Sequence, residues 1–305
     1  MGRARKGREV SGWICLDKNA GETSTQAVAS VKRLFGAAKA GHAGTLDPLA
    51  TGALPIALGE ATKTVSFVQD GRKVYRFTVK WGEETDTDDA EGKVVATSAE
   101  RPAADAIRAR LPEFTGEIMQ RPPAYSALKV DGERAYDLAR SGEEVALEER
   151  TIVVHRLDLI AIPDTDHAVF EAECGKGTYV RALARDFGRR LACLGHVVAL
   201  RRLVVGPFDE RAMLPLSRLI DAREAGDAAS LDALLLPVGV ALAGLPEIAV
   251  NASDAARIGR GQSVLIRGRD APLAASAAQA SHGGRSIAVG EIAEGAFHPR
   301  RVFKG

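Results

Sequence analysis

The sequence predicts an α+β fold with a mixed, largely antiparallel sheet, followed by a small C-terminal β-rich domain. Strands and helices are interspersed along the 305 residues without the regular β-α-β repeat of a parallel nucleotide-binding sheet. The composition shifts to Ala, Leu and Gly around residues 225–245, and a short unit with its own helix and strands follows. Hydrophobic residues make up 46% and charged residues 27% of the chain, which is typical of globular proteins.

Three elements in the first part of the chain have clear local signals in the sequence. GWICLD at 12–17 is a short apolar run that predicts a buried strand. The segment TSTQAVASVKRLFG that follows predicts a helix, with Thr23 or Ser24 as its N-cap and Gly36 at its end. KVYRFTVKWG at 73–82 alternates between polar and apolar positions and predicts a strand with one apolar face.

The middle of the chain predicts further helices and strands. We expect a short helix in 103–114, stopped by Pro112, and another over 131–142, ended by Gly142. Residues 144–174 are rich in β-branched side chains and predict two or three strands.

The remaining elements complete the prediction. TYVRALARDFGRRLACL (178–194) predicts a helix with an apolar stripe, and HVVALRRLVVGPF (196–208) returns to strand. In the C-terminal unit, NASDAARIGRGQ (251–262) predicts a helix. The low-complexity segment 270–285 predicts a flexible loop.

Composition excludes several protein classes. No apolar run approaches the roughly 18 residues of a membrane span, and the basic N-terminal arm 1–10 lacks the apolar region of a secretory signal. We interpret this arm as a solvated tail, with nucleic-acid contact as the weaker alternative. The three cysteines form no C-x-x-C pair, which favours a reducing cytoplasm over a disulfide framework or a thiolate zinc site.

Positive charge is concentrated in one segment although the net charge is only +1. Seven basic residues and one acidic residue lie between Lys176 and Arg202. Arg181, Arg185 and Arg189 recur every four residues and therefore share one helix face. This face is either a solvated basic surface, a phosphate-binding surface or a source of counter-ions for buried carboxylates.

The acidic stretch EETDTDDAEG at 83–92 resembles a calcium loop only superficially. Ala90 stands at the fifth position and Thr97 where the bidentate Glu is required, so a solvated turn between two strands is the better interpretation. The chain also lacks a Walker A loop and a G-x-S-x-G elbow, and its six histidines show no paired metal spacing.

The loop GHAGTLDPLATG at 41–52 is the strongest candidate for chemistry. Its glycines and Pro48 form a tight loop that would hold the side chain of Asp47 in one pose. The alternative is that Asp47 before proline is only a turn former. No second carboxylate and no Ser or Cys nucleophile lies nearby in sequence, so paired-acid glycosidase chemistry is not indicated.

HAGTLDPLATG, followed by LPIALGEATK (54–63), resembles the signature of the TruB family of pseudouridine synthases. The resemblance continues in the same order through KVYRFTVKWGEETDTDDAEG, RPPAYSALKVDGERAYDLARSG, GKGTYVRALARDFG and HVVALRR, and so covers most of residues 10–205. The C-terminal FHPRRVFKG resembles the family's small PUA-like RNA-binding domain. One departure is Asn19, where the family often has proline after lysine.

The resemblance implies a pseudouridine synthase catalytic domain over 11–240 and a PUA-like domain over 245–305. It implies isomerisation of uridine 55 in the TΨC loop of tRNA, in which the bond from ribose C1′ to base N1 breaks and C5 joins the sugar. That reaction needs no cofactor and no metal. The family further implies a cytoplasmic monomer that needs neither a membrane nor an obligatory protein partner.

The resemblance also assigns residues. Asp47 is the catalytic carboxylate, which attacks C1′ or C6 or takes the 2′ proton. Arg181 is its expected partner, and Tyr75 stacks on the target base, with an apolar strand residue as the weaker alternative for Tyr75. The remaining substrate-binding residues are Tyr179 and Leu200 at the uracil and His42 in the stack vacated by base flipping.

RNA binding is assigned in the same way. The segment of about 121–150 matches the family's mobile insertion that clamps the RNA arm. The expected RNA-backbone contacts are Lys63, Lys129, Arg185 and Arg202. Two rivals remain, the related catalytic subunit of guide-RNA ribonucleoproteins and an RNA-binding or tRNA-folding module without important catalysis.

Overall fold

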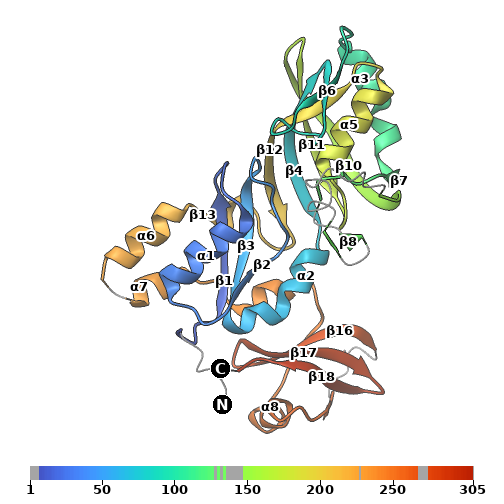
Figure 1. Cartoon of the computed structure of the whole chain (residues 1–305). Coiled ribbons are helices and arrows are strands. Elements are labelled where there is room, and N and C mark those ends of the chain that lie inside the picture. Colours follow the sequence, from blue (N-terminus) through green and yellow to red (C-terminus); the bar gives the residue numbers. More distant parts are fainter. Residues whose placement is uncertain are drawn as a thin grey trace.

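The computed structural model describes residues 7–126, 129–130, 133–134, 147–226, 228–266 and 274–304. A nine-stranded sheet forms the larger part of the molecule (Figure 1). Its strand order is β13-β1-β3-β12-β4-β11-β10-β7, with β2 also paired to β3. The β1–β13 and β3–β12 pairs are parallel and the other pairs are antiparallel, which confirms the mixed, largely antiparallel prediction. The strands are β1 (Gly12–Lys18), β2 (Ala40–His42), β3 (Thr51–Leu58), β4 (Lys73–Trp81), β7 (Gly116–Gln120), β10 (Arg150–Asp164), β11 (His167–Cys174), β12 (Gly195–Val205) and β13 (Met213–Leu214).

Helices pack at both ends of this sheet. The helices α1, α6 and α7 lie beside β1 and β13, and α3 and α5 lie at the end formed by β10, β11 and β7 (Figure 1). The short helix α2 follows the 3-10 helix η1 below β3. The bounds are α1 (Ser24–Phe35), η1 (Gly59–Thr64), α2 (Val65–Asp70), α3 (Ala104–Arg110), α5 (Val180–Arg190), α6 (Leu216–Glu224) and α7 (Ala228–Asp232).

Strands β1 and β3 are buried on both faces. Successive side chains of a strand point to opposite faces, and in β1 Ile14 and Leu16 join one core cluster while Trp13 and Cys15 join another. This burial explains why GWICLD is continuously apolar. At the far end of the sheet the core is aromatic, with the ring of Phe187 on α5 centred 5.5 Å from that of Phe170 on β11.

The capping residues predicted for the first helix cap α1 in the structure. Thr23 is the N-cap and forms a capping box with Gln26, and Gly36 ends the helix with φ 58°, a left-handed conformation that glycine adopts without strain. At α3 the helix ends at Arg110, and Pro112 stands in the following 3-10 helix η2 (Leu111–Phe114). Proline therefore ends the α-helix as predicted but is accommodated within the first turn of η2.

The C-terminal β-rich domain is a five-stranded sheet with order β14-β16-β17-β18-β15 and its own hydrophobic cluster, centred on Ile258, Ile292 and Phe297. The helix α8 (Ala252–Gly259) packs against it. The strands are β14 (Glu247–Ala249), β15 (Val264–Leu265), β16 (Ala275–His282), β17 (Arg285–Ala293) and β18 (Ala296–Val302).

Hydrogen bonds join this sheet to η1. The ammonium group of Lys63 donates to the carbonyl of Val302 (2.8 Å) and pairs with Glu60, whose carboxylate accepts from the backbone N–H of Lys304. Arg301 donates back to the carbonyl of Lys63. The 3-10 helix η4 (Val238–Leu242) leads from the larger part of the molecule into the C-terminal sheet and contacts η1.

Two loop predictions were wrong in part. Residues 275–282 of the predicted flexible loop form strand β16, because Ala278 and Ala280 are fully buried against β17 and tertiary packing outweighs the weak β-propensity of alanine. At the N-terminal arm, Arg8 bonds Gly36 and Asp232 and Val10 is buried, so the arm is packed against the protein from residue 7 onward.

Two further predictions concern the middle of the chain. Of the helix predicted over 131–142, Glu133–Arg134 is strand β9, paired with β8 (Lys129–Val130), and the other residues lie outside the described part of the chain. Of the two or three strands predicted in 144–174, the described residues form two, β10 and β11. In the described residues no helix is long and apolar enough to cross a membrane.

Candidate active site

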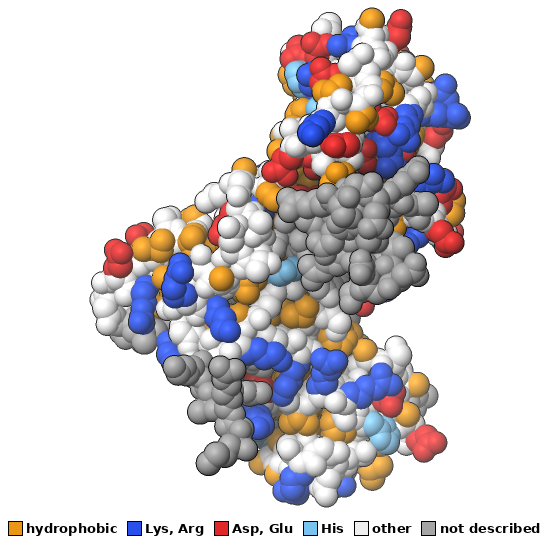
Figure 2. Space-filling model, in the orientation of Figure 1, with side chains coloured by type: hydrophobic (Ala, Val, Ile, Leu, Met, Phe, Trp, Pro, Cys, Tyr) orange, Lys and Arg blue, Asp and Glu red, His pale blue; other side chains and the backbone are white. Residues whose placement is uncertain are grey.

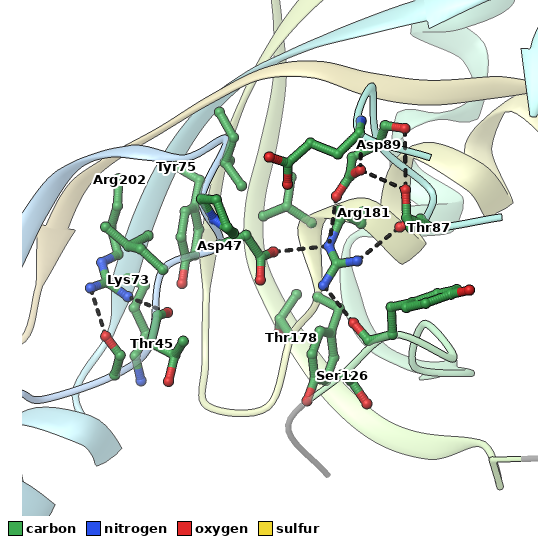
Figure 3. Close-up of a pocket in the computed structure, with 18 of the residues that line it drawn as sticks. Thr45, Asp47, Lys73, Tyr75, Thr87, Asp89, Ser126, Thr178, Arg181 and Arg202 are labelled. Carbon is green, nitrogen blue, oxygen red and sulfur yellow. Dashed lines mark hydrogen bonds and ion pairs between the residues drawn. The ribbon is translucent and has the colours of Figure 1, made fainter. Parts of the chain in front are cut away.

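A pocket of about 1010 Å³ opens where the 41–52 loop meets the middle of the main sheet. It is lined by residues 44–48, strand β4, the 86–93 loop that joins β5 (Glu83–Thr85) to β6 (Val94–Thr97), residues 176–181 and strand β12, and also by Gln69 of α2 and by Tyr125 and Ser126. Asp47 points into the pocket toward Arg181, with Tyr75 close by (Figure 3). Segments separated by more than 100 residues thus converge around one carboxylate.

The residues on either side of Asp47 are anchored to the protein. The hydroxyl of Ser24, the first residue of α1, accepts from the backbone N–H of Leu46 (2.8 Å) and donates to its carbonyl (2.9 Å). On the other side, the carbonyl of Pro48 accepts from the backbone N–H of Gly21 and from the ammonium group of Lys18. The Asp47 side chain is 36% exposed between these two anchors, so it faces the pocket in a fixed pose.

Arg202 supports the loop from behind. This side chain is fully buried and donates to the carbonyls of Ala53 (2.8 Å), Gly44 (3.0 Å) and Thr45 (3.4 Å). Gly52 is required here, because its φ is +95° and a Cβ would lie 2.3 Å from the carbonyl oxygen of Arg202. The tight loop expected from the glycine pattern is therefore confirmed, and β12 holds it in place.

Arg181 is the cation opposite Asp47. Its Nε lies 2.9 Å from Oδ2 of Asp47 and 3.5 Å from Oδ2 of Asp89. Its two terminal nitrogens donate to the carbonyls of Thr87 (2.8 Å) and Tyr125 (2.9 Å). The side chain is only 7% exposed, so the counter-ion interpretation of the α5 arginines is confirmed at this position.

The prediction of a solvated turn at 83–92 was wrong for two residues. Asp88 is 5% exposed and Asp89 is 3% exposed, because the loop packs against α5 and its carboxylates meet the arginines of that helix. Asp89 also accepts from the hydroxyl of Thr87 (2.6 Å) and the backbone N–H of Glu91. The sequence signal was limited to arginines four residues apart that could serve as counter-ions, and it did not show which carboxylates they meet.

Although no second carboxylate lies near Asp47 in sequence, the fold brings Asp89 and Glu91 to the same pocket. Burial raises the pKa of Glu91, and the negative charges of Asp89 and Asp47 raise it further. Asp89 is engaged by three donors, whereas Asp47 bonds Arg181 through one oxygen. Asp47 is therefore the carboxylate best placed to act on a molecule in the pocket.

The predicted apolar and aromatic residues line the same pocket. Tyr75 comes from β4 and Leu200 from β12. Burial raises the pKa of the Tyr75 hydroxyl, and the nearby charge of Arg202 opposes that rise. Tyr179 is the N-cap of α5, and the amide of the buried Gln120 on β7 bonds both its backbone N–H (2.9 Å) and its carbonyl (3.1 Å).

Other predicted residues lie elsewhere. His42 is on β2 opposite Ile56 and is not among the pocket-lining residues, and burial lowers the pKa of its imidazole. Lys63 bonds the C-terminal sheet. Arg185 and Arg202 are buried and bond protein acceptors, so the structure gives no support to RNA-backbone contacts by these two side chains. The side chain of Lys129 lies outside the described residues.

Lys18 was missed as a site residue, and its substitution should weaken the loop. The side chain is 1% exposed and donates to the carbonyls of Asn19, Glu22 and Pro48. We expect Lys18→Met to lower the free energy of unfolding by about 2 kcal/mol, because buried carbonyls lose their donor. Urea unfolding measures this, with the exposed Lys32→Met on α1 as the matched control. An unchanged midpoint for Lys18→Met would contradict the anchoring role.

Comparison with known proteins places this site in a family. A model described as the N-terminal domain of TruB family pseudouridylate synthase matches residues 32–180, and one for the tRNA pseudouridylate synthase B C-terminal domain matches residues 181–243. The chain is 62% identical over 302 residues to tRNA pseudouridine synthase B of Nitrobacter winogradskyi, covering 98% of this chain and 84% of that protein. It is 61% identical to tRNA pseudouridine synthase B of Rhodopseudomonas palustris, with 98% and 82% covered.

Solved structures agree on the fold. A Cbf5–Nop10–Gar1 complex contains a chain that matches with a TM-score of 0.74 at 26% identity, covering 96% of this chain and 84% of that one. An archaeal box H/ACA Nop10–Cbf5 complex matches with a TM-score of 0.72 at 24% identity, covering 100% and 92%, and this shows the fold alone. On the family models and the full-length relatives, this chain belongs to the TruB family of pseudouridine synthases.

Proposed function

We propose that this chain isomerises uridine 55 in the TΨC loop of tRNA to pseudouridine. The observation that carries the proposal is the carboxylate of Asp47, held by its anchored neighbours, paired with the buried Arg181 and facing a pocket lined by Tyr75, Tyr179 and Leu200. Relatives 55–62% identical over nearly the whole chain carry the name tRNA pseudouridine synthase B.

The reaction is balanced within one nucleotide. The C1′–N1 bond breaks, the base turns, C5 bonds to C1′, and the proton on C5 moves to N1. Asp47 acts in its ionised form by attacking C1′ or C6 or by taking the 2′ proton. The guanidinium of Arg181, 2.9 Å from Oδ2 of Asp47, orients this carboxylate in the pocket. Tyr75 stacks on the base, and Tyr179 and Leu200 retain the detached uracil.

The target base has to leave its stack to reach this pocket. His42, at the head of the loop, fills the vacated space, and the insertion of about 121–150 closes over the RNA arm. Phosphate contacts fall to lysines rather than to Arg185 and Arg202. Lys176 lies at the pocket with a side chain 73% exposed. Lys63 stays a proposed contact, with a side chain 30% exposed that also pairs with Glu60 and bonds the C-terminal sheet. Lys and Arg side chains gather at the junction with that sheet (Figure 2). Lys129 remains a proposed contact within the insertion.

The proposed organisation follows the family. Residues 1–10 are a basic arm, 11–240 the catalytic domain and 245–305 a PUA-like RNA-binding domain. The enzyme acts as a monomer in the cytoplasm, without a metal, a cofactor or an obligatory protein partner. The strongest alternative is a guide-RNA-dependent subunit, since the matching solved structures include Nop10 and Gar1 complexes.

Pseudouridine mapping of an unmodified tRNA transcript tests the proposal. We expect the pure protein to convert position 55 alone, without added metal, guide RNA or partner protein, because the described site already holds the carboxylate and its counter-ion. A transcript with uridine 55 replaced by cytidine is the control. Tight tRNA binding without conversion would contradict the proposal and favour a guided enzyme or a binding module.

A further inference from the structure

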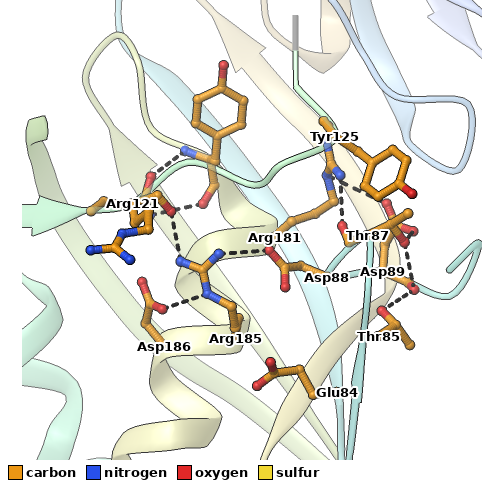
Figure 4. Close-up of polar contacts among 12 residues, drawn as sticks. Glu84, Thr85, Thr87, Asp88, Asp89, Arg121, Tyr125, Arg181, Arg185 and Asp186 are labelled. Atoms are coloured by element: carbon orange, nitrogen blue, oxygen red, sulfur yellow. Dashed lines mark hydrogen bonds and ion pairs between the residues drawn. The ribbon is translucent and has the colours of Figure 1, made fainter. Parts of the chain in front are cut away.

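A second buried ion pair lies one helical turn beyond Arg181. Arg185 donates from Nη1 to Oδ2 of Asp88 (2.9 Å) and from Nε to Asp186 (2.8 Å), and the Asp88 and Arg185 side chains are each 8% exposed (Figure 4). Neither residue lines the Asp47 pocket. Both line a second cavity, of about 840 Å³, on the other side of the 86–93 loop. The proposed reaction therefore leaves this pair without a direct contact to substrate.

The two arginines make parallel connections. Arg181 bonds Asp89 and the carbonyl of Thr87 on the 86–93 loop, and it bonds the carbonyl of Tyr125 in the insertion. Arg185 likewise bonds Asp88 on that loop and the carbonyl of Arg121 at the start of the insertion (2.7 Å). Each guanidinium thus joins α5 to the 86–93 loop, called here the aspartate loop, and to residues 121–125, called here the base of the insertion.

The backbone at Asp88 adopts a conformation that needs support. Its φ is +61°, in the left-handed region that few side chains adopt, although aspartate tolerates it better than most. The carbonyl of Asp88 accepts from the backbone N–H of Val197 on β12, and Arg185 holds its carboxylate. This arrangement directs the side chains of Asp88 and of the next residue, Asp89, toward consecutive turns of α5.

Stability alone does not account for the pair. Burial raises the pKa of Asp88 to about 6, and Arg185 and Arg181 only partly offset that rise. The ionised carboxylate is therefore held at a net cost of desolvation, and replacing a buried ion pair by well-packed apolar side chains of similar volume is often neutral or stabilising. An ionised Asp88 carboxylate held at this cost near the Asp47 pocket indicates that the Asp88–Arg185 pair fixes the positions of the segments around it.

We propose that Asp88 and Arg185 are positioning residues that hold the aspartate loop and the base of the insertion on α5, and thereby fix the guanidinium of Arg181 against Asp47. The proposal rests on the proposed function. The pair acts through Arg181 and touches neither base nor ribose. Losing it lowers the rate of the chemical step and leaves the affinity for tRNA nearly unchanged.

Single-turnover kinetics on the full-length protein test this role. We expect Asp88→Asn and Arg185→Gln each to slow pseudouridine formation by about 10- to 100-fold, as expected for a displacement of order 1 Å in an active site. The double variant is expected to be no slower than the slower single variant, because the two residues act as one unit. The Kd for tRNA is expected to stay within about threefold in all of them.

The matched control is Arg189→Gln on the next turn of α5. Arg189 pairs with Glu84, but its side chain is 53% exposed and it contacts neither Asp88 nor the insertion residues that Arg181 and Arg185 bond. Its rate is expected to remain within about twofold of the parent, since an exposed ion pair contributes little. Turnover by the parent and by this control establishes the function independently of the pair.

A pH profile adds a readout that a purely structural role would not change. As pH falls through about 6, Asp88 takes up a proton and the parent loses the ion pair, whereas Asp88→Asn is already neutral. The charged groups facing Asp88 are Arg185, Arg181, Glu84 and Arg189, and all are retained in Asp88→Asn. The ratio of parent to variant rate is therefore expected to shrink from pH 7.5 toward unity near pH 5.

Thermal unfolding separates a role in positioning Arg181 from a purely structural role in folding. Asp88→Asn is nearly isosteric and keeps an oxygen that can accept from Arg185, so it is the variant expected to fold like the parent. Parent-like rates in folded Asp88→Asn and Arg185→Gln would overturn the proposal, whatever their unfolding midpoints. A rate loss that Arg189→Gln shares, or one that follows tRNA affinity, would also overturn it.

Discussion

Asp47→Asn is expected to abolish pseudouridine formation, with a loss of at least about 10⁴-fold in single-turnover rate, because the amide can neither attack carbon nor take a proton. The substitution is nearly isosteric. Besides the ion pair of its side chain with Arg181, Asp47 holds the loop through its backbone carbonyl, which accepts from Ala50, and Leu46 and Pro48 are anchored independently. The fold and the affinity for tRNA are therefore expected to persist.

The measurement pairs pseudouridine quantification with tRNA binding on one preparation. Asp105→Asn is the matched control, because Asp105 on α3 is almost fully exposed and is not among the residues that line the pocket. Turnover by Asp47→Asn within tenfold of the parent would show that another group carries the chemistry. Loss of tRNA binding along with turnover would instead place Asp47 in RNA recognition.

The features that could be predicted from the sequence are those whose determining residues lie within the same short segment. The α1 helix was predictable because its cap, Thr23 with Gln26, and its terminator, Gly36, lie within the segment itself. The rigidity of the Asp47 loop was predictable from its glycines and proline. Burial of Asp88 and Asp89 was not, because it is decided by α5, about 90 residues later, and an acidic loop is solvated unless cations cover it.

The same distinction applies to the arginines. The four-residue spacing showed that Arg181, Arg185 and Arg189 share a face, but not which part of that face is covered. The 86–93 loop and the base of the insertion bury the first two, whereas Arg189 remains exposed. Strand β16 was missed for a related reason, since its alanines form a strand only when packed on β17.

Arg181 is the second position where a large effect is expected. Arg181→Met removes the donors to Asp47, to Asp89 and to the carbonyls of Thr87 and Tyr125. Breaking a buried ion pair by removing one partner costs about 3–5 kcal/mol, so the free energy of unfolding is expected to fall by that order. The single-turnover rate is expected to fall by about 10³-fold, because Asp47 loses the ion pair and the contact that orient it in the pocket.

Arg181→Lys separates charge from geometry. Lysine restores a positive charge near Asp47, but a single ammonium group cannot span Asp47, Asp89 and two carbonyls as the planar guanidinium does. Its stability is therefore expected to lie between those of the parent and Arg181→Met, with a rate still about 10²-fold below the parent. Urea unfolding and single-turnover kinetics measure the two effects, with the exposed Arg189→Met as control. A parent-like rate for Arg181→Lys would mean that charge alone is sufficient, and the geometric role of Arg181, together with the positioning role inferred for Asp88 and Arg185, would then be wrong.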